Sequence, residues 1–373
     1  MILWYKKLEI NLYNLKKNLQ ALKKFLSSDI KILPVIKNDA YGHGLIEVAK
    51  TLSEENVFGF GLSEPLEAYY LRKAGFVHPI LLLSGFEKDW ISEMRSLKII
   101  PVVTNMKQFE WLSKFTKEKL IKWEFHLKID TGMHRFGLPV EEIKQFIEKL
   151  KNTPQLQLTG IMTHFSAAEH PDSEITQLQL KLFKKSLKLF YKYKIFPKYV
   201  HFANSAGIIF FSEKGNLVRP GISLFGSYPC NEAYKYIKLF PVMTLKSKIV
   251  EIKKLKKGES AGYGPTFYAK KDTILGLIPV GYGDGYLRSL SNKGFAYYRN
   301  KRVPVVGTIS MKALYIDLNE IENPKIGEEV ILLGGKNNEV PADELAQLAG
   351  TISYEIFCSI GKSIPKEYKT EKC

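Results

Sequence analysis

The amino-acid sequence predicts an α/β protein in which an N-terminal (β/α)8 barrel of the TIM type is followed by a C-terminal, mostly-β domain. Between residues 30 and 225, eight short apolar runs alternate with segments of helical periodicity, a pattern typical of parallel βα units that close into a barrel. After about residue 238, long helical patterns give way to alternating polar and apolar segments separated by glycine and aspartate turns. This second pattern predicts antiparallel strands.

The barrel elements follow one another in order. A short strand is expected near Leu8, and Asn11 suits the N-cap of a helix that continues to Phe25 with leucines three or four residues apart. The eight barrel strands are expected at residues 30–37, 58–63, 80–84, 99–104, 125–130, 158–165, 199–205 and 218–225. Helices are expected between them at residues 45–52, 64–74, 88–96, 106–115, 140–150, 175–192 and 206–211.

A doubly wound sheet is the alternative arrangement of the same elements. Barrels carry their chemistry at the carboxyl ends of the strands. Here those ends hold a set of polar residues, namely Lys37, Asp130, Arg135, His164, Asn204, Ser205 and Arg219. This coincidence favours the barrel.

The second domain is expected to contain strands near residues 244–252, 274–280, 301–307 and 330–335, with only residues 341–348 forming a clear helix. The expected domains are residues 1–238 and 239–373, joined by a tight, packed junction near residues 236–241. The strand near the N-terminus can pack with the second domain.

Composition predicts a cytoplasmic protein without a membrane segment. No apolar run reaches the roughly 18 residues of a membrane span, and the first residues place apolar side chains before charges, the reverse of a secretory signal. The three cysteines are far apart, which fits neither a disulfide framework nor a zinc site. The net charge of +17 would be consistent with nucleic-acid binding. The lysines, however, are spread through segments of helical periodicity, as on the solvent-exposed faces of helices. We therefore expect no nucleic-acid, membrane or metal partner.

Lys37 is the first candidate for chemistry. The apolar run from Ile32 ends on this lysine, and a turn-prone Asn-Asp-Ala-Tyr-Gly-His-Gly segment follows. Partial burial at the mouth of a barrel would lower the pKa of the amine, which suits Schiff-base chemistry with an aldehyde cofactor. A surface lysine at a strand end is the alternative.

A cofactor of this kind that carries a phosphate also needs hydrogen-bond donors for the phosphate and a partner for its ring nitrogen. The segment Val218-Arg219-Pro-Gly221 supplies an arginine and a glycine whose backbone can approach a phosphate, and Asn204-Ser205 opens a helix. Arg-Pro-Gly is also a common turn. His164 and His201 can each be either a functional residue or a core residue whose hydrogen bonds are satisfied inside the protein.

Lys128 is unusual because it lies within an apolar strand. A buried lysine is costly unless it is paired or neutralised, and Arg135 would be a natural partner for a carboxylate or for a modified lysine. In the second domain, Tyr263 and Tyr282 each stand between glycines, either for close approach to a ligand or as turn residues. Because residues 239–373 contain no histidine, proton transfer from this domain would fall to tyrosine.

These segments together resemble the alanine racemases, which are fold-type III pyridoxal-phosphate enzymes, over nearly the whole chain. The resemblance rests on eight ordered motifs: Val35-Ile-Lys37-Asn-Asp-Ala-Tyr41-Gly-His-Gly, Leu127-Lys-Ile-Asp-Thr-Gly-Met-His-Arg135, His201-Phe-Ala-Asn-Ser205, Val218-Arg-Pro-Gly-Ile-Ser, Gly262-Tyr263-Gly, Pro279-Val-Gly-Tyr282-Gly-Asp-Gly, Gly307-Thr-Ile-Ser-Met311 and Ile352-Ser-Tyr354-Glu.

The resemblance implies a homodimeric enzyme that interconverts L- and D-alanine with pyridoxal 5'-phosphate and supplies D-alanine for peptidoglycan. It implies that Lys37 binds the cofactor and acts as one base, with Tyr263 from the partner subunit as the opposed base. His164 would link Arg219, at the pyridine nitrogen, to Tyr263. The implied phosphate site is formed by Tyr41, Ser205, Gly221, Ile222 and Tyr354, next to Asn204.

The resemblance also implies how the substrate is held. Arg135 and the backbone of Met311 would bind the substrate carboxylate, Tyr282 would line the entry, and Lys128 would be carbamylated and so able to pair with Arg135. Three positions depart from the family pattern: Lys312 replaces an aspartate, Ser363-Ile-Pro-Lys366 replaces Arg-Val-Pro-Arg, and His134 replaces a glycine.

Other functions are consistent with parts of the pattern. A racemase of serine or lysine is one, because Lys312 changes the charge near the entry. An amino-acid decarboxylase of the same architecture is another, although Arg219 disfavours it because such decarboxylases usually place a carboxylate at the ring nitrogen. A non-catalytic pyridoxal-phosphate carrier would be a lone barrel, so the second domain speaks against it.

Overall fold

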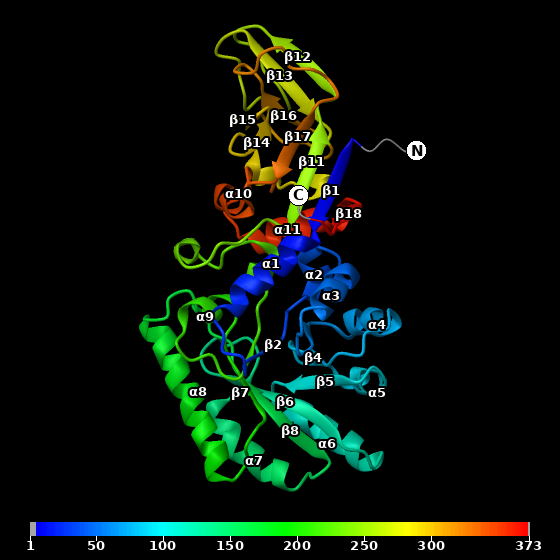
Figure 1. The fold of residues 1–373 in the computed structure, drawn as a ribbon, viewed down its shortest axis with the longest axis vertical. Coiled ribbons are helices and arrows are strands. Elements are labelled where there is room, and N and C mark those ends of the chain that lie inside the picture. Colours follow the sequence, from blue (N-terminus) through cyan, green and yellow to red (C-terminus); the bar gives the residue numbers. More distant parts are fainter. Residues whose placement is uncertain (1–4, 372–373) are drawn as a thin grey trace.

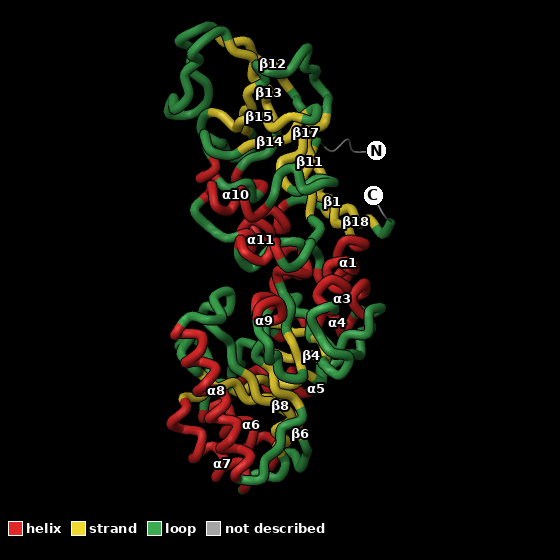
Figure 2. The backbone as a smooth tube through the Cα atoms, turned by 60° about the vertical axis from the view of Figure 1, so that its left-hand side comes forward, coloured by secondary structure: helices red, strands yellow, loops and turns green. Residues whose placement is uncertain are grey.

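The computed structural model describes residues 5–371, which form two stacked parts. In Figure 1 the lower part has short strands with helices around them, and the upper part is mostly strands of a twisted sheet. Figure 2 shows the same division from another side, with helices around the lower part and mostly strands and loops in the upper part. The predicted combination of a barrel and a mostly-β domain is therefore confirmed.

The lower part is a closed eight-stranded barrel. Each strand overlaps one of the predicted eight: β2 (Lys31–Ile32), β3 (Phe60–Leu62), β4 (Ile80–Leu82), β5 (Ile99–Val103), β6 (Trp123–Asp130), β8 (Leu156–Met162), β9 (Tyr199–His201) and β10 (Leu217–Val218). Strands β3, β4, β5, β6, β8 and β9 pair in that order, and β10 pairs with β2. The N–H of Arg219 donates to the carbonyl of Ala203 over 2.9 Å, and a parallel bridge joins Val35 to Gly61. These contacts close the ring on both sides of β2 and β10.

Helices cover the outside of the barrel at the expected places. They are α3 (Leu45–Ser53), α4 (Pro65–Lys73), α5 (Ile91–Ser96), α6 (Met106–Glu118), α7 (Ile143–Lys151), α8 (Glu174–Lys192) and α9 (Ser205–Phe210). In α8 the buried residues Phe183, Leu187 and Phe190 recur at helical spacing and face the barrel. The preceding α1 (Leu12–Lys23) begins after Asn11, whose side chain accepts the N–H of Asn14 over 2.8 Å. The predicted N-cap is confirmed.

Short elements complete the connections. Strand β7 (Leu138–Pro139) pairs with β6. The 3-10 turns are η1 (Lys88–Trp90), η2 (Val140–Glu142), η3 (Ile222–Phe225), η4 (Asn231–Lys235), η5 (Tyr282–Asp284) and η6 (Arg288–Leu290).

The upper part is a nine-stranded sheet that includes the N-terminal strand. Its order is β12 (Glu251–Leu255), β13 (Thr273–Ile278), β16 (Leu314–Asp317), β15 (Lys301–Val306), β14 (Phe295–Tyr298), β17 (Glu329–Leu333), β11 (Met243–Lys248), β1 (Lys6–Asn11) and β18 (Lys366–Lys369). Strand β1 pairs antiparallel with β11 and parallel with β18. The first strand of the chain thus packs with the second domain.

Helix α10 (Ala342–Ala349) overlaps the predicted helix, but the expectation that it is the only clear helix of this domain is wrong. A second helix, α11 (Ser353–Ser363), follows it. Residues such as Ile356, Phe357 and Gly361 have low helix propensity, so the local pattern did not indicate a helix. Burial against α2 (Lys37–Gly42) and α10 overrides that propensity: a Cβ on Gly361 would lie 2.2 Å from the carbonyl oxygen of Gly42.

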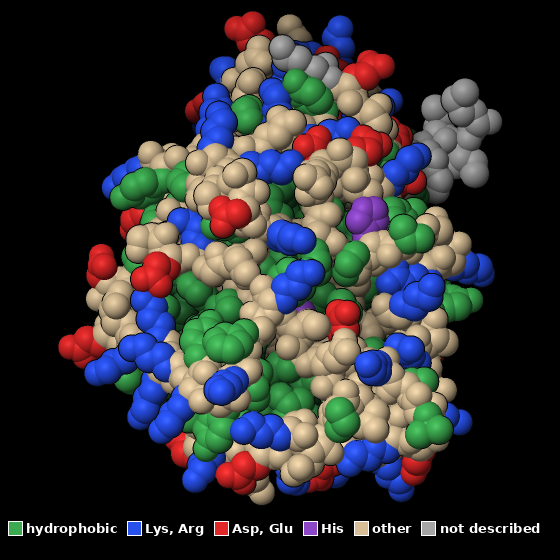
Figure 3. Space-filling model, turned by 60° about the horizontal axis from the view of Figure 1, so that its bottom comes forward, with side chains coloured by type: hydrophobic (Ala, Val, Ile, Leu, Met, Phe, Trp, Pro, Cys, Tyr) green, Lys and Arg blue, Asp and Glu red, His purple; other side chains and the backbone are tan. Residues whose placement is uncertain are grey.

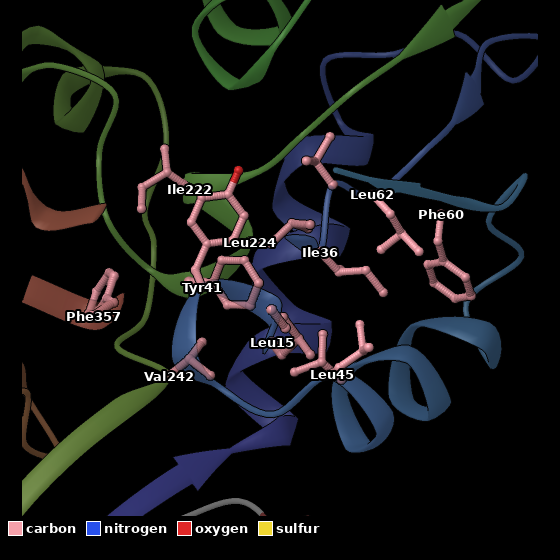
Figure 4. Packing of buried hydrophobic residues seen from close by; sticks show 14 of the residues in the cluster. Leu15, Ile36, Tyr41, Leu45, Phe60, Leu62, Ile222, Leu224, Val242 and Phe357 are labelled. Carbon is pink, nitrogen blue, oxygen red and sulfur yellow. The ribbon is translucent and has the colours of Figure 1, made fainter. Parts of the chain in front are cut away.

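The two parts share one buried apolar cluster. Leu15 of α1, Tyr41 of α2, Val242 before β11 and Phe357 of α11 belong to it. Figure 4 shows these side chains, which come from distant parts of the sequence, gathered around the start of the barrel. The junction therefore holds the second part firmly against the barrel end where Lys37 lies.

The positive charge is distributed over the surface. Figure 3 shows Lys and Arg side chains scattered over the visible face among Asp and Glu side chains. Among the described residues, no helix is long and apolar enough to cross a membrane.

Candidate active site

A cavity of about 450 Å³ lies at the carboxyl ends of the barrel strands. Segments that follow β2, β6, β8, β9 and β10 contribute to it, together with the start of α11. Eleven of the residues singled out in the sequence line this cavity: Lys37, Tyr41, Lys128, Arg135, His164, Asn204, Ser205, Arg219, Gly221, Ile222 and Tyr354. The fold therefore brings together most of the predicted site from one chain.

Lys37 is the first residue of α2 rather than the last residue of a strand, because β2 already ends at Ile32, and its side chain is partly buried in the cavity. Burial lowers the pKa of the Lys37 amine, and the Arg135 guanidinium lowers it further, whereas the Glu67 carboxylate acts in the opposite direction. A larger fraction of the amine is therefore neutral at physiological pH than for an exposed lysine. A neutral amine is the nucleophilic and basic form.

The turn after Lys37 has an unusual handedness. Residues Asn38, Asp39, Ala40 and Tyr41 all have φ of 53° to 54°, so the segment that was expected to be turn-prone forms a left-handed turn, α2. The left-handed conformation costs roughly 1–2 kcal/mol for each residue that carries a Cβ. Strain of this kind concentrates at functional sites. The turn places Tyr41 in the same cavity as Lys37.

Tyr41 lies close to the backbone of Gly221. A Cβ on Gly221 would lie 2.8 Å from the Tyr41 hydroxyl oxygen, so this position has no room for a side chain. The Tyr41 ring also contacts Tyr354, with ring centroids 5.7 Å apart. Burial raises the pKa of Tyr41, and it raises the pKa of Tyr354 to about 12. Both hydroxyls keep their protons at neutral pH and can donate to an anion.

Ser205 and its neighbours gather polar groups next to this tyrosine pair. The Ser205 hydroxyl accepts the N–H of Gly221 over 3.0 Å and that of Ser223 over 3.4 Å. The Asn204 side chain caps α9 by accepting the N–H of Gly207 over 3.0 Å. The Ser223 hydroxyl is also buried without a hydrogen-bond partner among the described residues, but Ser223 is not among the residues that line the cavity. Because the Ser205 oxygen accepts both of its hydrogen bonds, its own proton can be donated to a phosphate, together with those of Tyr41 and Tyr354.

Arg219 is buried beneath the cavity, with 3% of its surface exposed. One guanidinium nitrogen, Nη2, donates to the carbonyl of Thr163 over 2.8 Å, and Nη1 lies 3.1 Å from Nδ1 of His201. Nε2 of His201 in turn lies 2.8 Å from Nδ1 of His126. Burial lowers the pKa of Arg219 to about 9, so the guanidinium stays protonated at neutral pH.

These contacts identify two residues that sequence reasoning had not placed. His201 was ambiguous in the sequence, and His126 stood in an apolar strand with no local signal of a role. His164 lines the cavity, and its pKa lies well below the ordinary value because of burial and the nearby guanidinium of Arg219. The link from His164 to Tyr263 stays a prediction, because Tyr263 lies outside this cavity.

Lys128 is buried and lies among other cations. Burial lowers the pKa of Lys128 to about 7, and the guanidinium groups of Arg219 and Arg135 contribute to that shift. Its amine lies 5.4 Å from the ring centre of Phe136. Among residues 5–371, Glu169 is the only acidic residue that lines the cavity, against four Lys and Arg side chains. The site therefore favours a ligand with several negative charges.

Three predicted residues lie in the upper part and do not line the cavity. They are Tyr263, Tyr282 and Met311, with exposed fractions of 74%, 44% and 57%. Tyr282 and Met311 lie on adjacent loops, because the N–H of Gly283 donates to the carbonyl of Met311 over 2.9 Å. Within one chain, the predicted site residues thus fall into two groups: those that line the barrel cavity and the three exposed residues of the upper part.

The three departures from the family pattern all have partners. Lys312 pairs with buried Asp284 over 2.7 Å, His134 contacts Asp130 over 3.1 Å, and Lys366 pairs with Asp39 of the left-handed turn over 3.0 Å. Within residues 5–371, no group of three or more His, Cys, Asp or Glu side chains is arranged to hold a metal ion.

Comparison with known proteins gives a consistent result. Residues 10–229 match the model for the alanine racemase N-terminal domain, and residues 242–368 match that for the C-terminal domain. An alanine racemase of Thermodesulfovibrio yellowstonii is 40% identical over 368 residues, covering 98% of both chains. The structure of an alanine racemase of Clostridium difficile 630 superimposes with a TM-score of 0.91 at 33% identity, covering 100% of this chain and 97% of that one.

A third relative is informative about ligands. The alanine racemase of Bartonella henselae, whose structure has covalently bound pyridoxal phosphate, superimposes with a TM-score of 0.88 at 26% identity. It covers 98% of this chain, and this chain covers all of it. Because both family models match and the similarity extends over the whole length, the chain belongs to the alanine racemase family.

Proposed function

We propose that the chain interconverts L-alanine and D-alanine with pyridoxal 5'-phosphate, using Lys37 of one subunit and Tyr263 of the partner subunit as opposed bases. One observation carries the assignment: Lys37, with a lowered pKa, lies in a cation-rich cavity at the carboxyl ends of the barrel strands. Membership of the alanine racemase family supports alanine as the substrate.

The residues of the cavity fit pyridoxal phosphate. When bound, this cofactor supplies an aldehyde that reacts with amines and a ring that stabilises negative charge on the adjacent carbon. Lys37 would provide the amine. The phosphate would be held by Tyr41, Ser205, Gly221, Ile222 and Tyr354, with Asn204 supporting Ser205. The hydroxyls of Tyr41, Ser205 and Tyr354 all line the cavity, and the raised pKa values of the two tyrosines keep them as hydrogen-bond donors, which supports this assignment.

Arg219 would face the ring nitrogen and donate a hydrogen bond to it. Its guanidinium holds its protons, and His201 and Thr163 fix its direction. An arginine at this position does not protonate the ring, so negative charge on the substrate carbon is stabilised only moderately and side reactions are suppressed. A guanidinium at the ring nitrogen favours racemisation over decarboxylation, which usually relies on a carboxylate there.

Lys37 and the partner's Tyr263 would exchange protons with the substrate carbon from opposite faces. Inversion requires two such groups, because a base on one face returns the proton to that face. Tyr263 is exposed in the single chain and can therefore meet a second copy. His164, next to Arg219, would link Arg219 to this tyrosine.

The substrate carboxylate would be bound by Arg135 and by the backbone of Met311, with Tyr282 at the entry. Carbamylation of Lys128 would convert an unfavourable buried cation into an anion that pairs with Arg135. The lowered pKa of Lys128 supports this modification, because only the neutral amine reacts with carbon dioxide.

The proposal requires a homodimer, since Tyr263, Met311 and Tyr282 lie outside the barrel cavity of their own chain. Residues 1–238 would form most of the cofactor-binding site, with Tyr354 added from the second domain of the same chain, and residues 239–373 would supply Tyr263 and Met311 to the site of the other subunit. The physiological role would be cytoplasmic supply of D-alanine for peptidoglycan.

Borohydride reduction of the cofactor-loaded enzyme, followed by peptide mapping, tests the central assignment. The pyridoxyl label is expected on the peptide that contains Lys37. A label on any other lysine would contradict the proposal.

A racemase acting on serine or lysine is the second candidate. It is favoured by Lys312, which places a cation next to Met311 and pairs with Asp284. Turnover of both enantiomers should be compared across alanine, serine and lysine. Alanine is expected to be turned over most efficiently, and little activity on alanine would favour the second candidate.

A further inference from the structure

We propose that Glu67 is a positioning residue, whose carboxylate holds the left-handed turn that places Lys37 and Tyr41 in the cavity. The inference rests on the proposed function of that cavity. Glu67 belongs to the first turn of α4, and its side chain is half-buried beside α2. Nothing in the local sequence distinguishes it from the many solvent-exposed glutamates.

The turn needs an external support. Four consecutive residues, Asn38 to Tyr41, are left-handed, and none of them is a glycine. Residues with a Cβ visit this region singly rather than in runs. Such a run persists only when the surrounding structure determines it. The contacts around the turn therefore decide where Lys37 and Tyr41 point.

Glu67 provides this support at the Lys37 end. One carboxylate oxygen, Oε1, accepts the N–H of Asn38, the residue directly after Lys37. The other, Oε2, accepts the N–H of Ser63 over 3.1 Å. The side chain thus ties the turn to the segment between β3 and α4. A carboxylate is a strong acceptor for backbone N–H groups.

A different set of contacts supports the other part of the turn. Asp39 accepts the N–H of Leu45 over 2.7 Å and pairs with Lys366 over 3.0 Å. These contacts do not involve Asn38 or Glu67. Loss of Glu67 would therefore loosen the turn next to Lys37 without unfolding α2 as a whole.

Glu67 also acts on Lys37 through its charge. Its carboxylate raises the pKa of Lys37, in opposition to burial and to Arg135. A neutral amide at this position would keep one acceptor for Asn38 but remove the charge. Replacement by glutamine and by alanine therefore separates the electrostatic contribution from the support of the backbone.

The experiment compares Glu67→Ala and Glu67→Gln with the matched control Glu64→Ala. Glu64 lies three residues earlier on the same segment and is exposed. The measurements are the apparent dissociation constant for pyridoxal phosphate, kcat and KM for alanine, and the thermal midpoint. Glu67→Ala is expected to weaken cofactor binding and to lower kcat by about tenfold each, the order expected for losing hydrogen bonds to a charged acceptor. KM for alanine should change by less than about twofold, because the proposed carboxylate ligands are untouched.

Glu67→Gln should show a smaller loss, together with a shift of the acidic limb of the pH–rate profile to lower pH, because the carboxylate that raises the pKa of Lys37 is removed. Glu64→Ala should match the wild type in every measurement.

A rescue variant tests the strain argument directly. Ala40 has φ of 53°, where glycine is favoured over alanine and no side-chain hydrogen bond is lost. The double variant Glu67→Ala with Ala40→Gly should bind pyridoxal phosphate at least about threefold more tightly than Glu67→Ala alone. Absence of rescue would overturn the positioning role, as would a Glu67→Ala variant that behaves like Glu64→Ala.

The result is separable from a failure of the proposed function. If the pyridoxyl label in the wild type is not on Lys37, the proposed function fails. If Lys37 is labelled but Glu67→Ala retains full cofactor affinity and kcat, only the role of Glu67 fails.

Discussion

Nη1 of Arg219 lies 3.1 Å from Nδ1 of His201, and both side chains are buried. A guanidinium only donates hydrogen bonds, so Nδ1 of His201 must accept. The proton of His201 then resides on Nε2, which donates to Nδ1 of His126. The orientation of Arg219 in the cavity is therefore fixed by two neutral histidines from β9 and β6.

Replacing His201 by leucine should remove the acceptor and leave a buried guanidinium donor unpaired. The free energy of unfolding is expected to fall by about 1–3 kcal/mol, and kcat by about tenfold as Arg219 reorients. Urea unfolding and steady-state kinetics measure the two effects. The His201→Asn variant can still accept a hydrogen bond at its amide oxygen, so its losses in stability and in kcat are expected to be smaller than those of the leucine variant. A leucine variant with unchanged kcat would contradict the argument.

Acid should destabilise the protein through its buried histidines. Burial lowers the pKa of His43 and of His126 to about 3, and that of His201 lies well below the ordinary value. The unfolded chain takes up these protons near pH 6.5, whereas the native state does not, so the unfolded state binds more protons below that pH. The stabilisation is complete above about pH 6.5 and is lost as pH falls towards 3.

Urea unfolding at about pH 7.5, 6 and 5 measures this loss before most carboxylates titrate. Each buried histidine should contribute up to about 1.4 kcal/mol per pH unit. Replacement of the exposed His170 by glutamine should leave the slope unchanged. A constant free energy of unfolding over this range would rule out the prediction.

Tyr263→Phe should impair proton transfer on the L-alanine side while cofactor binding stays intact. Loss of a proton-transfer group typically costs about 10²–10⁴-fold in rate. Exchange of the substrate α-hydrogen with deuterated solvent, started separately from each enantiomer, measures the asymmetry. Tyr268→Phe is the matched control, because Tyr268 is an exposed tyrosine in the same loop region. Unchanged racemisation by Tyr263→Phe would refute the two-base assignment.

Lys128 should carry a carbamate in bicarbonate buffer. Its pKa of about 7 leaves much of the amine neutral at slightly alkaline pH, and the resulting anion would relieve repulsion among Lys37, Arg135 and Arg219. Carbon-13 NMR with labelled bicarbonate should show one carbamate signal that is absent from Lys128→Ala. A wild-type spectrum without that signal would contradict the modification.

Much of the fold could be predicted from the sequence because its signals are local. An apolar run such as residues 99–104 indicates a strand through its own composition, and Asn11 indicates a helix start through its own side chain. The motifs around Lys37 and Arg219 identified the family, which the matches over residues 10–229 and 242–368 bear out. The order of the elements and the residues at the strand ends were thus determined by the sequence alone.

The tertiary structure decided what depends on distant partners. Helix α11 forms despite weak propensity because Gly361 packs against Gly42, and the left-handed turn at Asn38 persists beside Glu67. His126 and His201 meet across 75 residues of sequence to orient Arg219. No local pattern can report such contacts, because hydrogen bonding and burial between remote segments exist only once the chain has folded.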